Sequence, residues 1–203
     1  SLDLASPLSE EDMQIQSMPD ASPTKWHLAH TSWAFETFVL KPHLSTYRVF
    51  HPKYEYLFNS YYNAIGKQYP RPQRGLLSRP SFKEILEYRS YIDQQMHDFL
   101  LIGGEDMFWL VRLMINHEQQ HQELILTDIL HALSHNPLYP QYDRRKRVNY
   151  QQLGLEWTRF DSGLYPIGHN NEAFYFDNEG PQHQYYLESF QLANRLVSCG
   201  EYL

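Results

Sequence analysis

Cysteine is almost absent from this chain, with Cys199 as the single one among 203 residues. One cysteine excludes a disulfide framework within the chain and is typical of a reducing compartment. Long apolar runs are missing too, since none approaches the roughly 18 residues of a membrane-spanning helix. Residues 1–4 also lack the basic and then apolar pattern of a signal peptide. The sequence therefore predicts a cytoplasmic protein that does not enter a membrane.

Positive charge is the second shortage, with 17 Lys and Arg residues against 24 Asp and Glu residues and a net charge of −7. A nucleic-acid-binding protein needs clustered Lys and Arg to contact phosphates. The one basic run, residues 144–147, is short, and we interpret it as a solvated linker. The sequence thus argues against nucleic acid as a partner. Hydrophobic residues make up 42% of the chain, which is enough for a real core.

Helical patterns dominate the chain up to about residue 137. The first strong helix is expected to begin at Pro23, with Ser22 as its N-cap, because proline suits the first helical position. It should stop before Pro42, since proline interrupts helical hydrogen bonding. Residues at spacings of three and four give this helix one inward face: Trp26, Ala29, His30, Trp33 and Thr37.

Three further helices are expected. One covers residues 54–64, and the segment after it, residues 69–75, is too rich in proline to be helical. The next opens with a capping box, in which Ser81 is the N-cap and Glu84 stands three residues later. The longest covers residues 106–135. Four such helices predict a mainly α fold, a four-helix bundle, whose core commonly holds metal sites.

The pattern changes to short aromatic-rich runs from residue 153 onward, separated by Gly, Asn and Asp turns. The expected strands are residues 157–160, 185–187 and 190–192, and the expected turns are residues 161–163 and 177–181. This tail buries little, and we interpret it as the opening of a second domain. The predicted organisation is a metal-binding bundle at residues 1–140, a linker at 141–152 and an irregular, β-containing domain start at 153–203.

The most informative motif is the run from His117 to His121, which reads His-Glu-Gln-Gln-His. Residues four apart lie on one face of a helix, so both imidazoles can reach one ion. The pair alone also fits two surface histidines or two hydrogen-bonded core histidines. His30, on the inward face of the first helix, is the best third ligand. His27, one turn earlier, could substitute for it but lies nearer the flank. Three neutral imidazoles leave open positions and suit non-haem iron(II), and zinc is not excluded.

Several segments together resemble the ergothioneine-biosynthesis sulfoxide synthases. Residues 17–31, 71–80 and 117–128 resemble parts of that family's first domain. Residues 174–183 and 197–203 resemble the start of its second domain, although Thr-Asn is commoner at the Ser198-Cys199 position. The resemblance covers essentially the whole chain. It implies a DinB-like four-helix bundle followed by the beginning of a formylglycine-generating-enzyme-like, sulfatase-modifying domain.

The resemblance also assigns roles by position. It implies three iron(II) ligands: His30, His117 and His121. Glu123 falls on the motif's acidic residue, and we expect it to orient an imidazole. Arg71 and Arg74 match arginines that hold the carboxylates of the thiol substrate, which suits a forked guanidinium. A solvated loop is the other interpretation of these two arginines.

The implied reaction joins the sulfur of cysteine or γ-glutamylcysteine to the imidazole ring of N-trimethylhistidine, with dioxygen as oxidant and a sulfoxide as product. The family's catalytic tyrosine and most of its groups for the trimethylammonium are expected beyond Leu203. These 203 residues alone are therefore expected to bind iron weakly and not to catalyse the full reaction. The sequence leaves open which thiol is used, and whether free histidine replaces N-trimethylhistidine.

Three alternatives remain at this point. The first is a DinB-like thiol transferase, in which a divalent metal activates a small thiol. The second is a zinc protease, because the His117 to His121 run satisfies the pattern H-E-x-x-H. It is weaker, since the third ligand of such proteases normally follows the motif, whereas His30 precedes it. The third is a non-catalytic bundle that serves as a binding module.

Overall fold

The computed structural model describes residues 1–102, 107–143, 153–171 and 173–203. The chain divides into two units, Ser1–Arg144 and Arg145–Leu203. The basic run at residues 144–147 and most of the linker predicted at residues 141–152 lie outside the described ranges. Within those ranges, no helix combines the length and apolarity that crossing a bilayer requires.

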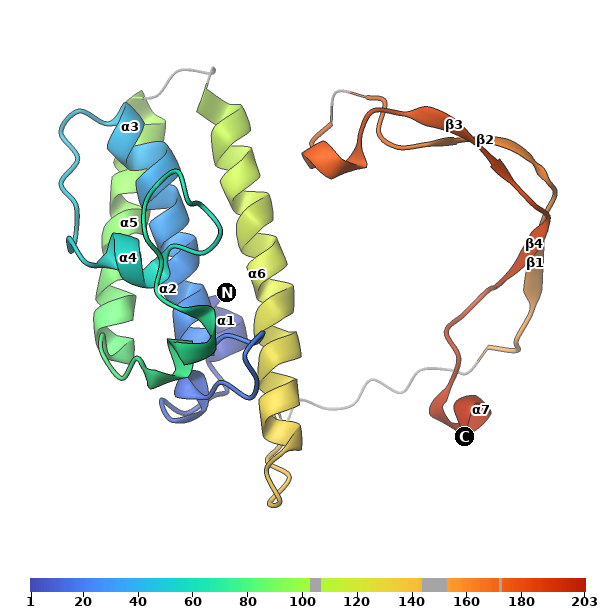
Figure 1. The fold of residues 1–203 in the computed structure, drawn as a ribbon, viewed down its shortest axis with the longest axis horizontal. Coiled ribbons are helices and arrows are strands. Elements are labelled where there is room, and N and C mark those ends of the chain that lie inside the picture. Colours follow the sequence, from blue (N-terminus) through green and yellow to red (C-terminus); the bar gives the residue numbers. More distant parts are fainter. Residues whose placement is uncertain (103–106, 144–152, 172) are drawn as a thin grey trace. The chain divides into compact units, whose positions relative to one another are not determined.

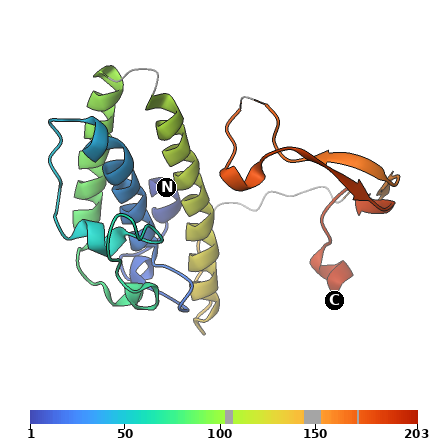
Figure 2. The same ribbon diagram turned by 45° about the horizontal axis from the view of Figure 1, so that its top comes forward.

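Long helices build the first unit. They are α2 (Thr24–Phe35), α5 (Phe82–Ile102) and α6 (Phe108–Ser134), and they lie side by side in both ribbon views (Figures 1 and 2). Helix α2 packs against both α5 and α6 and so forms the centre of the unit. Shorter elements complete it: α1 (Leu2–Ala5), η1 (Asp12–Gln14), η2 (Glu36–Leu40), α3 (Lys41–His43), α4 (Tyr54–Phe58) and η3 (Arg71–Leu76).

The four-helix bundle is not confirmed, because the helix predicted at residues 54–64 is wrong beyond Phe58. Asn59 leaves the helix with an extended backbone, at ψ 144°. Its fully buried side-chain amide donates hydrogen bonds to the carbonyl oxygens of Tyr62 and Gly66, at 3.2 and 3.1 Å. These bonds stabilise a tight loop in place of further helical turns.

Both predicted ends of the first helix need correction. Ser22 does not cap α2, because Pro23 is the N-cap residue and the Ser22 hydroxyl accepts a hydrogen bond from Arg74 instead. The helical path also continues past Leu40 through α3, which includes Pro42. The path crosses the π-helical turn η2, in which the N–H of Lys41 bonds the carbonyl oxygen of Glu36, and it ends at His43, one residue after Pro42.

The predictions for α5 and α6 are closer to the structure. The capping box of α5 is confirmed, since the backbone N–H of Ser81 donates to Glu84 at 2.7 Å and that of Glu84 donates to the Ser81 hydroxyl at 3.3 Å. Helix α6 ends at Ser134, within one residue of the predicted end, and its predicted start at residue 106 lies outside the described residues. The prediction that residues 69–75 are not helical holds for residues 69 and 70 and is wrong from Arg71, where the 3₁₀ helix η3 begins with proline only in its first turn.

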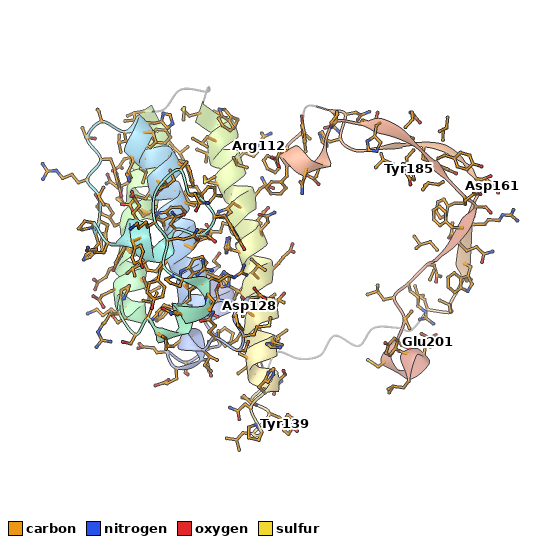
Figure 3. All side chains as sticks on the ribbon, in the orientation of Figure 1. Arg112, Asp128, Tyr139, Asp161, Tyr185 and Glu201 are labelled. Carbon is orange, nitrogen blue, oxygen red and sulfur yellow. The ribbon has the colours of Figure 1, made fainter. Side chains whose placement is uncertain are left out.

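The core of the first unit lies around α2, whose residues from Thr24 to Ala34 are all buried. Figure 3 shows side chains filling the space between the helices. One polar cluster ties the three long helices together: Arg89 of α5 donates to the Thr31 hydroxyl of α2 at 3.0 Å and forms an ion pair with Glu118 of α6. This cluster fixes α6 at Glu118, the residue that follows His117.

The second unit is built from two antiparallel strand pairs. Strand β1 (Trp157–Phe160) pairs with β4 (Phe190–Ala193), and β2 (Gly163–Ile167) pairs with β3 (His183–Leu187). The β2–β3 pair lies between β1 and β4 in the sequence, and the two pairs follow each other closely, since Phe160 faces Phe190 and Gly163 faces Leu187. Strand β2 was not predicted, since residues 161–163 were interpreted as a turn and proline at position 166 weakens the strand pattern.

Two short helices, η5 (Asp177–Glu179) and α7 (Cys199–Tyr202), complete the second unit. Its large apolar side chains are mostly exposed, as for Tyr185, which is labelled in Figure 3 and 58% exposed. The expectation that this region buries little is confirmed by these exposures. A sulfatase-modifying identity for it stays a prediction.

Candidate metal centre

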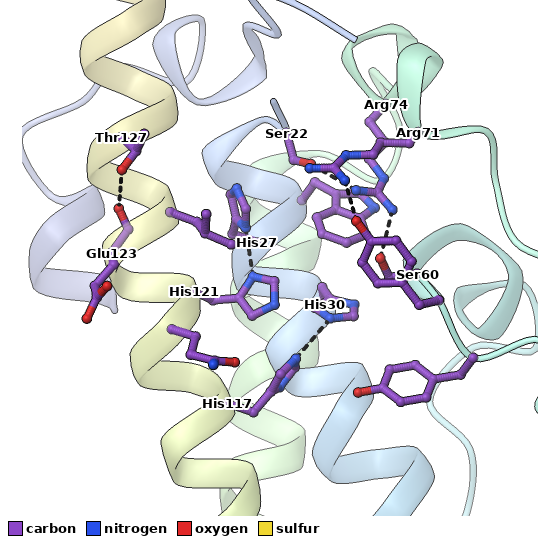
Figure 4. Close-up of a pocket in the computed structure, with 15 residues that line it drawn as sticks. Ser22, His27, His30, Ser60, Arg71, Arg74, His117, His121, Glu123 and Thr127 are labelled. Atoms are coloured by element: carbon purple, nitrogen blue, oxygen red, sulfur yellow. Dashed lines mark hydrogen bonds between the residues drawn. The ribbon is translucent and has the colours of Figure 1, made fainter. Parts of the chain in front are cut away.

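Three histidines from two helices converge on one point. His30 comes from α2, and His117 and His121 come from α6, as Figure 4 shows. One nitrogen of each ring lies within 4.8 Å of the corresponding nitrogens of the other two, so the group can hold a metal ion. The structure therefore brings the three predicted residues together.

The spacing of two of these nitrogens suits a shared ion. The Nε2 atoms of His30 and His117 lie 3.3 Å apart. Two nitrogens that bind one ion at about 2.1 Å with tetrahedral angles lie about 3.4 Å apart. The two rings share a hydrogen bond, which a metal bound by both Nε2 atoms would replace. The Nδ1 atom of His117 is buried without a hydrogen-bond partner among the described residues.

The ring of His30 is fixed on all sides. Its Nδ1 donates a hydrogen bond to the carbonyl oxygen of Phe58 at 2.6 Å, because a carbonyl only accepts. The neutral ring then has a bare Nε2, which points toward His117 (Figure 4). Trp26 stacks on the ring at 4.6 Å and Trp33 at 5.3 Å, measured between ring centroids. His30 is thus a pre-positioned nitrogen donor.

His121 is fixed through a second histidine. His27 lies between His121 and Asp128, with its Nδ1 atom 2.8 Å from Nδ1 of His121 and its Nε2 atom 3.1 Å from Oδ2 of Asp128. His27 is only 2% exposed, so the expectation that it lies toward the flank is wrong. The signal that could have found it is the spacing of Asp128, seven residues after His121 and on the same helix face.

Burial keeps these imidazoles neutral. It is the largest cause that lowers the pKa of all four histidines: His27, His30, His117 and His121. The neighbouring histidines add to it, since the charge of His117 lowers the pKa of His30 and the charge of His30 lowers that of His121. A neutral imidazole is the form that binds a metal, so the site is prepared for one at neutral pH.

A buried cation lies beside the histidines. Arg74 is 3% exposed, and its guanidinium lies 3.5 Å from the ring centroid of Trp26. Its Nη atoms donate to the hydroxyls of Ser22 at 2.9 Å and Ser60 at 3.3 Å. Burial, and then the charge of Arg71, lowers its pKa to about 10, so it stays charged at neutral pH. Among the described residues, no carboxylate forms an ion pair with it.

Arg71 adds a second positive charge to the same cavity. This partly buried side chain donates to the Tyr61 hydroxyl and to the carbonyl oxygen of Asp20. Both are neutral acceptors, so the charge of Arg71 also lacks an ion-pair partner within the part of the chain that the structure describes. The cavity holds about 480 Å³, a size that suits a small molecule. Two arginines on its wall make it attractive to an anion.

Glu123 lies at the exposed rim of the cavity. Its backbone carbonyl accepts a hydrogen bond from Thr127, as Figure 4 shows. The carboxylate that contacts an imidazole in this structure belongs to Asp128, and the role expected for Glu123 stays a prediction. Sequence reasoning therefore found the three histidines and the two arginines, but missed His27 and Asp128 as their neighbours.

The family can now be stated. Residues 1–101 match the model of the DinB superfamily. This part of the chain is a DinB superfamily domain. The DinB match includes His30 and both cavity arginines, and it ends before His117 and His121. DinB proteins are often metal-dependent, in agreement with the three-histidine group. No curated protein matches the chain.

Proposed function

We propose that the chain binds iron(II) through His30, His117 and His121 as part of an O2-dependent sulfoxide synthase. The proposed reaction joins the sulfur of cysteine or γ-glutamylcysteine to the imidazole of N-trimethylhistidine. The observation that carries the proposal is one cavity in which three neutral imidazoles meet two arginines that form no ion pair with any described residue. The sequence resemblance to the ergothioneine-biosynthesis enzymes supports the finer assignment.

The donor set fits the proposed ion. Three imidazole nitrogens are borderline donors that suit iron(II), and they leave other coordination positions free. When bound, iron(II) would supply the chemistry with dioxygen and favour the thiolate form of the thiol. The protein's own contribution is to fix two of the imidazoles through hydrogen bonds from their far nitrogens, from His30 to Phe58 and from His121 to His27.

Both arginines fit a thiol that carries carboxylates. Cysteine has one carboxylate and γ-glutamylcysteine has two, and the guanidinium fork binds such groups in bidentate fashion. Arg74 is held in place by stacking on Trp26, so little conformational freedom is lost when it binds. Trp26 also stacks on His30, so Arg74 and His30 contact the same ring, which supports a thiol carboxylate bound close to the proposed metal site.

Cobalt(II) offers a test that does not depend on turnover. We expect the cobalt-loaded protein to develop a thiolate-to-metal absorption band when γ-glutamylcysteine or cysteine is added. Arg74→Ala should weaken that thiol's apparent affinity about tenfold or more, with unchanged cobalt content. The matched control is Arg112→Ala, an exposed arginine of α6 that does not line the cavity. Cobalt binding without a thiolate band would contradict the proposal.

A thiol transferase is the second candidate, because three imidazoles also form a common zinc site. It would share the cavity and the metal group, and it would not use dioxygen. Anaerobic loading with iron(II) or with zinc, followed by thiol addition in air to a protein that also contains the expected second domain, separates the two. Iron(II)-dependent oxygen uptake supports the sulfoxide synthase, and activity only with zinc supports the transferase.

A further inference from the structure

We propose that His27 and Asp128 are positioning residues that hold His121 in the tautomer and orientation that metal binding requires. This inference rests on the proposed metal site and names two residues beyond its ligands. It starts from the Nδ1 atoms of the three proposed ligands, of which only that of His30 bonds a backbone partner, while that of His117 has no partner among the described residues. His30 has such a partner in Phe58, whereas His121 has a chain of two side chains.

Asp128 is the fixed end of the hydrogen-bonded series that runs from His121 through His27. Its Oδ2 atom accepts the backbone N–H of Ser22 at 2.8 Å and lies 3.1 Å from Nε2 of His27. Its side chain is 12% exposed, so water competes little for the carboxylate. Because an ionised carboxylate only accepts, the proton of a neutral His27 lies on Nε2. The other nitrogen of His27, Nδ1, is therefore a bare acceptor.

The bare nitrogen of His27 sets the proton on His121. The two Nδ1 atoms lie 2.8 Å apart, so Nδ1 of His121 must donate. A neutral His121 then has its lone pair on Nε2, and this nitrogen is free for a metal. Metal-bound histidines usually donate their second ring N–H to an acceptor of this kind, and loss of that acceptor typically weakens metal affinity 10–100-fold.

The same contacts exclude His27 as a ligand in this arrangement. Each of its two nitrogens already has a hydrogen-bond partner, Asp128 on one side and His121 on the other. It is also absent from the group of nitrogens that lie within 4.8 Å of one another. His27 therefore acts on the metal through His121, and its loss should weaken the site without removing a ligand.

The test compares three variants of the chain in cobalt(II) titrations, with circular dichroism to check folding. His27→Phe keeps a ring in the buried position and removes the nitrogen that accepts from His121. Asp128→Ala removes the carboxylate that holds His27. Both should bind cobalt(II) roughly 10–100-fold more weakly than the wild type. His131→Phe is the matched control, because His131 lies on α6 together with Asp128, bonds Ser17 and does not line the cavity. It should keep wild-type affinity.

A second readout needs no metal. Long-range ¹⁵N–¹H NMR correlations of the metal-free protein should show His121 protonated at Nδ1, and His27→Phe should abolish that preference. Wild-type cobalt affinity in folded His27→Phe and Asp128→Ala, or His121 protonated at Nε2 in the wild type, would overturn the inference and leave the proposed function intact. A wild type that binds no cobalt(II) would overturn the metal site itself and the positioning role with it.

Discussion

Helices α2 and α6 both supply candidate ligands, but they are buried in different ways. Every residue of α2 from Thr24 to Ala34 is buried, whether polar or apolar. Helix α6 buries one stripe that includes Met114, His121 and Ile125, and its other faces are exposed or half-buried. A helix enclosed on all sides holds its ligand within the core, whereas a helix with one buried stripe presents its ligands at the wall of a cavity.

The enclosed helix pairs most of the polar groups that it buries, although Nε1 of Trp33 has no hydrogen-bond partner among the described residues. Thr31 and Ser32 donate to the carbonyl oxygen of Leu28, and Lys25 donates to the carbonyl oxygen of Leu77. Glu36, just after α2, is 2% exposed and accepts bonds from two tyrosine hydroxyls. Substitutions in α2 should therefore affect stability and metal binding together, and those in α6 should separate the two.

The largest expected effect comes from removing a ligand from each helix. His30→Ala and His117→Ala should each reduce bound metal to background, because two imidazoles bind far more weakly than three. Their stabilities should differ: His30→Ala leaves a cavity between two tryptophans and costs about 3 kcal/mol, whereas His117→Ala costs about 1 kcal/mol or less. Metal analysis and urea unfolding of the metal-free proteins measure both. Equal losses of stability in His30→Ala and His117→Ala would contradict the proposed difference between the enclosed α2 and the one-stripe burial of α6.

A buried glutamate offers the next comparison. Glu36→Ala leaves the hydroxyls of Tyr47 and Tyr88 and the backbone N–H of Phe50 without their acceptor. We expect a loss of about 3 kcal/mol or more, since each unsatisfied buried donor costs about 1–3 kcal/mol. Glu123→Ala, at the exposed rim of α6, should change stability by about 0.5 kcal/mol or less. Thermal and urea unfolding give both values, and a small effect at Glu36 would contradict the account.

Acid should weaken the metal-free fold. Burial lowers the folded-state pKa of His27, His30, His117 and His121 below the ordinary value of 6.5. The unfolded chain then binds more protons than the folded one, so stability is complete above pH 6.5 and falls as the pH decreases below it. Each histidine contributes at most about 1.4 kcal/mol per pH unit.

Urea unfolding at about pH 7.5 and about pH 5.5, without metal, measures this loss. The slope of stability against pH should be smaller in His117→Ala than in the wild type, because one buried neutral imidazole is gone. A wild type equally stable at the two pH values would show that the four histidines are not held neutral by the fold.

The smallest effect is expected from one substitution made on each helix. Thr31→Ala removes a buried hydroxyl that accepts from Arg89 and donates to Leu28, and should cost about 1–2 kcal/mol. Thr127→Ala removes an exposed hydroxyl that bonds only the carbonyl oxygen of Glu123 in the same helix. It should change stability by about 0.5 kcal/mol or less. A larger loss at Thr127 than at Thr31 would reverse the comparison.

Sequence patterns predicted the ends of α5 and α6, each of which buries one stripe, better than they predicted the ends and burial of α2. The capping box of α5 and the end of α6 depend on local chemistry, so Ser81, Glu84 and Ser134 lie where the sequence placed them or next to it. The burial of α2 on all sides is set by the neighbours that surround it, and a helical pattern cannot show them. The same limit explains Asn59, whose loop bonds end α4 early.

The candidate site also has residues that local spacing predicts and residues that depend on tertiary contacts. The spacing of His117 and His121 on one helix, and the inward face of His30, predicted residues that do converge. His27 and Asp128 were missed as neighbours of the site because their contact joins two helices about a hundred positions apart in sequence. The buried Arg74 could be placed beside the histidines only through the family resemblance, since its stacking on Trp26 depends on tertiary packing.

The central claim is that three histidines from two helices hold one metal ion. Its most direct test is metal analysis of protein purified anaerobically with added iron(II), comparing the wild type with His117→Ala and with His131→Ala as a control. We expect the wild type and His131→Ala to retain the same amount of iron, and His117→Ala to hold only background iron. Equal iron in all three proteins, or none in the wild type, would contradict it.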